Sequence, residues 1–194
     1  LFLLLLAGIN NSPLFTRRQT YMPRFMQSWG VGAAGQVAGV YLAYLCLMIL
    51  CVVVIFIPLY LCLEREWFTI PEWEGMGAEP LTQFLPALLP VTAMFSALQF
   101  LLNEIMAGVV SGILLQFLCG IGMGYLSGFF YPAAFFPDIM QRLGRIMPTG
   151  AALRYVNGSV AKEESGMAGF GVLLYLAVFL VLSVYVRRSR IRRG

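Results

Sequence analysis

Long runs of apolar residues alternate with short polar stretches along this chain of 194 residues. At about 1.5 Å per residue, the longest run would form a helix of roughly 40 Å, and the hydrocarbon core of a bilayer is about 30 Å thick. The pattern therefore predicts membrane-spanning helices. The expected spans are residues 37–63, 81–102, 105–130 and 170–186, preceded by residues 1–15 as the end of a truncated span.

Charged residues in the connections predict how these spans are oriented. Arg17, Arg18 and Arg24 follow the first run without an acidic residue among them. The connection 64–79 contains five glutamates and one arginine, and five arginines follow the last run in the tail 187–194. Because basic residues favour the cytoplasmic side, we expect the first loop and the C-terminus inside and the acidic loop outside. The expected location is the cell inner (cytoplasmic) membrane, with several crossings.

Composition supports a membrane location and narrows the functional classes. Hydrophobic residues make up 60% and charged residues 11% of the chain, with a mean hydropathy of +0.82. A soluble domain has about 25% charged residues. Histidine is absent from the sequence, which removes the commonest metal ligand and general base, so we predict no catalytic, cofactor or metal site. Four cysteines without CxxC spacing are expected to be core residues: Cys46, Cys51, Cys62 and Cys119.

Three prolines divide the stretch between the last two spans. Pro132 is expected to end the preceding helix, Pro137 to begin an amphipathic helix whose apolar face packs against the spans, and Pro148 to end it. A second short helix is expected over 151–160. These helices are too short to cross, so residues 131–166 are predicted to form an outer re-entrant hairpin, with a membrane-surface loop as the alternative. The residues assigned to this outer gate are Gly128, Pro132, Pro137, Leu143 and Pro148.

A second amphipathic segment is predicted in the first basic loop, over residues 16–36. Its apolar residues recur at i, i+3, i+4 and i+7, which is helical spacing, and small residues that permit close packing follow them. A surface helix without a partner has the same pattern and stays an alternative. The candidate contact residues are Met22, Arg24, Phe25, Met26 and Trp29.

The stretch Ser127–Gly150 resembles the outer re-entrant segment of the ABC type-2 exporter permeases. Ser127, Gly128 and the three prolines stand where that family has its Ser-Gly and proline positions, and the order of basic loop, spans, hairpin and basic tail also matches. The resemblance implies an all-α polytopic membrane protein with the six-helix permease fold. About five spans would be present here, and the first helix would be missing. Gly35-Gln36 departs from the Gly-Lys that family members often have.

This resemblance implies the permease subunit of an ATP-driven exporter for an amphipathic, drug-like or lipid-like substrate. The sequence has no GxxxxGK[ST] phosphate loop, so the chain is not expected to be an enzyme. ATP and Mg²⁺ would bind to a separate ABC ATPase subunit, on which residues 16–36 would dock as the coupling helix. A second permease copy or paralogue and membrane lipid are the other implied partners, and nucleic acid is not.

Two further classes of function stay open. An ion-coupled secondary carrier usually has an ionisable residue inside the membrane, and Glu104 is the candidate. We expect Glu104 instead to be a solvated or helix-capping residue at a turn beside Asn103. A non-transporting membrane scaffold subunit is the other alternative, and a membrane-embedded enzyme is disfavoured because paired carboxylates are absent from the predicted spans.

Overall fold

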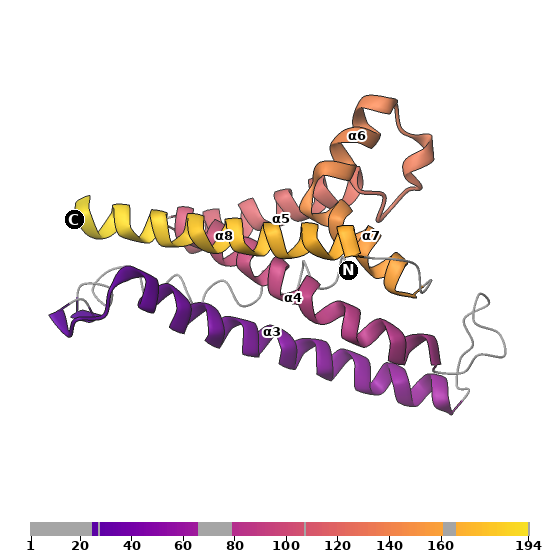
Figure 1. The fold of residues 1–194 in the computed structure, drawn as a ribbon, viewed down its shortest axis with the longest axis horizontal. Helices are drawn as coiled ribbons and strands as arrows, with labels where there is room; N and C mark the ends of the chain where they lie inside the picture. Colours follow the sequence, from indigo (N-terminus) through magenta and orange to yellow (C-terminus); the bar gives the residue numbers. More distant parts are fainter. Residues whose placement is uncertain (1–24, 27, 66–78, 107, 161–165, 194) are drawn as a thin grey trace.

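Every regular element in the part of the chain that the computed structural model describes is a helix. The described residues are 25–26, 28–65, 79–106, 108–160 and 166–193. The elements are α3 (Ala33–Glu64), α4 (Glu79–Ile105), α5 (Val109–Leu126), the 3-10 turn η2 (Ala133–Phe135), α6 (Asp138–Ile146), α7 (Pro148–Val160) and α8 (Gly166–Arg193) (Figure 1). The predicted all-α class is confirmed for these residues.

Within the described residues, three helices are long and apolar enough, by length and composition, to cross a membrane. They comprise α3, α4 from Phe84 onward, and α8 as far as Ile191. α5 has 18 residues, which corresponds to about 27 Å. These helices indicate a membrane protein. α8 continues through the basic residues that we had assigned to a tail, since arginine is a good helix former and no glycine or proline interrupts its last turns.

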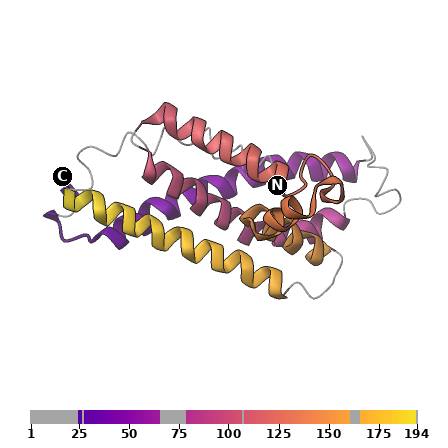
Figure 2. The same cartoon turned by 90° about the horizontal axis from the view of Figure 1, so that it is seen from above.

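α4 is the central helix of the bundle. It contacts α3, α5, α7 and α8, and Figure 2 shows it between α5 and α8. Within the most apolar window of each helix, 67% of the α4 residues are buried, against 22% for α3 and 11% for α8. α3 and α8 therefore present most of their surface outward, where lipid can cover it.

The helices define two ends of the molecule. At one end α3 begins, α4 ends and α8 ends with its arginines; we call this the basic end. At the other end α3 ends, α4 and α8 begin, and α6 and α7 form a pair of short helices; we call this the hairpin end (Figure 1). The connection 127–147 turns back at the hairpin end, and α6 projects from the bundle there.

A glycine ends α5, not the proline that we had expected to end it. Gly128 adopts a positive φ of 86°, and its N–H donates to the Tyr125 carbonyl at 3.2 Å. The Phe129 N–H donates to the Gly124 carbonyl at 3.0 Å, so the two bonds cap the last carbonyls of the helix. The expectation that the helix continues to residue 130 and stops at Pro132 is therefore wrong, because the left-handed glycine breaks it first.

The other two prolines lie where helices begin. Pro137 caps α6 with an extended backbone (φ −55°, ψ 150°), in agreement with the predicted helix start. Met147, the residue before Pro148, has ψ 151° and ends α6, since a residue before proline is pushed out of the helical region. Pro148 is then the first residue of α7, a position that tolerates its missing N–H. The second helix therefore begins at Pro148 and not at Ala151.

Candidate functional site

A buried ion pair joins α4 to α8 at the basic end. The Arg187 guanidinium donates to both carboxylate oxygens of Glu104, with Nε to Oε2 at 2.8 Å. The exposed fractions of the two side chains are 12% for Arg187 and 6% for Glu104. The expectation that Glu104 is a solvated or capping residue is therefore wrong. The arginine fork matches the carboxylate geometry and satisfies both oxygens of a charge that would otherwise be costly to bury.

A second arginine holds the end of α4. The Arg190 guanidinium donates to the carbonyls of Ile105 and Met106, at 3.1 and 3.3 Å. The last carbonyls of a helix have no partner within the helix, and a cation near them also complements the helix dipole. Arg187 and Arg190 are three positions apart, so they lie on the same side of α8. One side of α8 is therefore bound to the end of α4 by an ion pair and by hydrogen bonds.

A stripe of buried polar side chains runs along α4 from the middle of the bundle to this ion pair. Gln99 accepts a hydrogen bond from the Tyr44 hydroxyl on α3 at 2.8 Å. Asn103 accepts one from the Gln116 amide on α5 at 2.7 Å. Buried polar groups inside a membrane bundle are costly and typical of functional regions. The stripe, at spacing i, i+4, i+7 and i+11, consists of Thr92, Ser96, Gln99 and Asn103.

The apolar face of α6 does not pack against the spans as we had expected. Ile139 is 74% exposed, Ile146 69% and the gate residue Leu143 48%. Gly144 is the buried residue of this helix, and α6 contacts α5 and α7 through a different side. In a single chain the apolar face of α6 is therefore free to meet another surface.

Close backbone approaches fix α6 and α7 on the end of α5. A Cβ on Gly144 would clash with the Leu126 carbonyl, and one on Gly150 would clash with the Gly144 carbonyl. The hydroxyls of Ser127 and Thr149 share a hydrogen bond of 2.5 Å, and the Thr149 hydroxyl also lies 3.1 Å from the Met123 carbonyl. Glycine permits these approaches because it has no Cβ. The base of the hairpin is consequently a closely packed contact between α5, α6 and α7.

The candidate coupling residues lie partly in the described chain. Met22 and Arg24 fall outside the described residues. Phe25 and Trp29 are 60% and 76% exposed, with ring centroids 6.0 Å apart. They precede α3, which begins at the basic end (Figure 1). Met26 accepts hydrogen bonds from the backbone N–H groups of Trp29 and Val31, at 3.2 and 3.1 Å. This turn presents two aromatic rings to the outside of the bundle.

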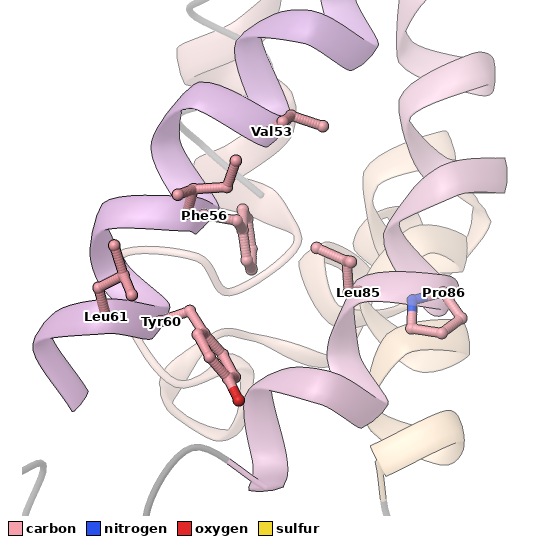
Figure 3. A pocket seen from close by; sticks show the side chains of 7 residues that line it. Val53, Phe56, Tyr60, Leu61, Leu85 and Pro86 are labelled. Atoms are coloured by element: carbon pink, nitrogen blue, oxygen red, sulfur yellow. The ribbon is translucent and has the colours of Figure 1, made fainter. Parts of the chain in front are cut away.

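An apolar pocket of about 420 Å³ lies between α3 and α4, towards the hairpin end. Apart from the Tyr60 hydroxyl oxygen and the Pro86 ring nitrogen, the stick atoms of the residues labelled in Figure 3 are carbon. A pocket of this size and lining suits an apolar or amphipathic molecule. The labelled residues are Val53, Phe56, Tyr60, Leu61, Leu85 and Pro86.

Sequence reasoning missed the polar stripe and the partners of Glu104. The signal for the stripe was present, because four polar residues at helical spacing interrupt an otherwise apolar run. The ion pair had no such signal, since 83 positions separate Glu104 from Arg187. No protein-family model, curated protein or solved structure matches this chain.

Proposed function

We propose that this chain is the permease subunit of an ATP-driven ABC exporter, which moves an amphipathic, drug-like or lipid-like substrate with energy from a separate ATPase. The observation that carries the proposal is the form of the connection between α5 and α8. It ends α5 with Gly128, forms two short helices that begin at Pro137 and Pro148, and stays at the hairpin end (Figure 1). This form agrees with the outer hairpin that the resemblance to the ABC type-2 permeases implies.

The opposite end of the bundle supports the same proposal. The exposed rings of Phe25 and Trp29 lie at the end where α8 carries its arginines, the end that charge assigns to the cytoplasm. Exposed aromatic side chains are typical anchors of protein interfaces. An ATPase bound to this turn would act directly on the first residues of α3.

A second permease copy would complete the hairpin end. The exposed apolar side chains of α6 project from a base held by the Gly144 and Gly150 contacts. In a dimer these faces would meet each other or the substrate path. The two hairpins would then close the outer end of a substrate path that lies between the two permease copies.

The experiment is purification of the complete protein from its native membrane, followed by identification of bound ABC ATPase and a transport assay. We expect the ATPase to co-purify and the double variant Phe25→Ala/Trp29→Ala to lose most of it. The matched control is Tyr131→Ala/Phe135→Ala, which removes another exposed aromatic pair with centroids 5.8 Å apart at the hairpin end. ATPase that stays bound to the first double variant, with normal transport, would contradict the coupling role.

One observation favours a second candidate, an ion-coupled carrier. Glu104 is a buried carboxylate next to the polar stripe of α4, and such residues mark ion paths in membrane proteins. Its pairing with Arg187 favours a structural role over ion binding. The two candidates differ in their energy source: depletion of ATP at a constant ion gradient stops the exporter, and collapse of the gradient at constant ATP stops the carrier.

A further inference from the structure

α8 has two different sides at the basic end. Arg187 and Arg190 face α4, where Glu104 and the α4 carbonyls engage them. The other side carries exposed residues at helical spacing, and the hydrogen bonds from α8 to Glu104, Ile105 and Met106 come from Arg187 and Arg190, not from this side. These residues are Val178, Val181, Leu182, Tyr185 and Arg188.

Towards the end of α8 this exposed stripe changes from aliphatic to aromatic to basic side chains. A lipid leaflet changes in the matching order, from acyl chains through the interface to the headgroup phosphate. Val181 is 67% exposed, and Tyr185, 71% exposed, follows four positions later. Arg188 then lies three positions beyond Tyr185, is exposed, and has no hydrogen bond or ion pair with another described residue. Aliphatic side chains match acyl chains, tyrosine favours the interface, and arginine binds phosphate through its planar fork.

We propose that Tyr185 and Arg188 form a binding site for the headgroup phosphate of an anionic phospholipid at the basic end of the bundle. The lipid's acyl chains would lie along Val181 and Leu182. Arg188 has no acidic neighbour along α8, because the described residues 166–193 contain no aspartate or glutamate. Arg192 follows Arg188 by four positions and adds a positive charge to the same helix. Charge therefore favours anionic over zwitterionic headgroups. The inference is independent of the transport function.

The test is native mass spectrometry of the full-length protein with equal amounts of phosphatidylglycerol and phosphatidylcholine that carry the same acyl chains. We expect the wild-type chain to retain phosphatidylglycerol preferentially. Arg188→Gln should lower this preference about five-fold, which corresponds to about 1 kcal/mol for one arginine at a membrane surface. Arg188→Lys should keep part of it, because the charge remains and the fork is lost.

Arg142→Gln is the matched control, since it removes one exposed arginine at the hairpin end. It should leave the lipid preference unchanged. Equal preference in wild type and Arg188→Gln would overturn the site. An equal loss in both arginine variants would show an effect of net charge alone and would overturn it too. Absence of any preference in the wild type would also overturn it, and would point to a protein surface opposite Arg188.

Discussion

Glu104 and Arg187 depend on each other because neither charge has full access to water. Their side chains are 6% and 12% exposed, and both carboxylate oxygens accept from one guanidinium. Exposed ion pairs contribute about 1 kcal/mol or less, whereas loss of one partner of a buried pair leaves an unpaired charge. The pair is therefore a requirement of this packing more than a source of stability.

Glu104→Ala should lower the free energy of unfolding by about 3 kcal/mol or more, because it leaves Arg187 without its carboxylate. Replacement of both partners, Glu104→Leu/Arg187→Met, should restore most of the loss. Thermal unfolding in one detergent, at equal protein concentration, measures both changes. The control is Arg142→Gln, an exposed arginine at the hairpin end, which should change the midpoint little. An unchanged midpoint in Glu104→Ala would show that the packing does not require the pair.

At the scale of helices, the sequence predicts the position of a helix best where the thickness of the membrane sets the length of that helix. The spans around α3, α4 and α8 could be predicted because an apolar run without charges has few other stable forms in a chain of this composition. The end of α5 was predicted too far along the chain, because we expected Pro132 to end the helix. Gly128, four residues earlier, has a positive φ and ends it first. The direction of the α6 apolar face could not be predicted, since it depends on the contact of Gly144 with Leu126.

Gly144→Ala should loosen α6 from α5, because the added Cβ has no room beside the Leu126 carbonyl. We expect faster proteolysis between α6 and α7 and a lower unfolding midpoint. Gly122→Ala is the control: it adds the same methyl group within α5, where no heavy atom lies within 4 Å of the new Cβ. That variant should be neutral or stabilised by up to about 1 kcal/mol, the helix propensity difference between the two residues. Equal rates of proteolysis in both variants would show that the close contact between α6 and α5 does not hold α6 in place.

For the whole molecule, the two ends differ in charge and in form. The basic end has the α8 arginines and the exposed Phe25–Trp29 pair, and the hairpin end has α6 and α7. The sequence predicted this separation from loop charges, and the structure brings the start of α3 and the end of α8 to one end (Figure 1). Which end faces the cytoplasm depends on the membrane and stays a prediction.

We predict that the basic end faces the cytoplasm, because arginines near the ends of spans are retained on that side. In a variant without the four native cysteines, Glu64→Cys at the end of α3 should react with a membrane-impermeant maleimide added to intact cells. Ser189→Cys near the end of α8 should react only after the membrane is opened. The two positions lie at opposite ends of the bundle, so each controls for the expression and reactivity of the other. Labelling of Ser189→Cys in intact cells, with Glu64→Cys protected, would reverse the orientation. It would also place the Phe25–Trp29 turn outside, where no ATPase could bind it, and the exporter proposal would fail with it.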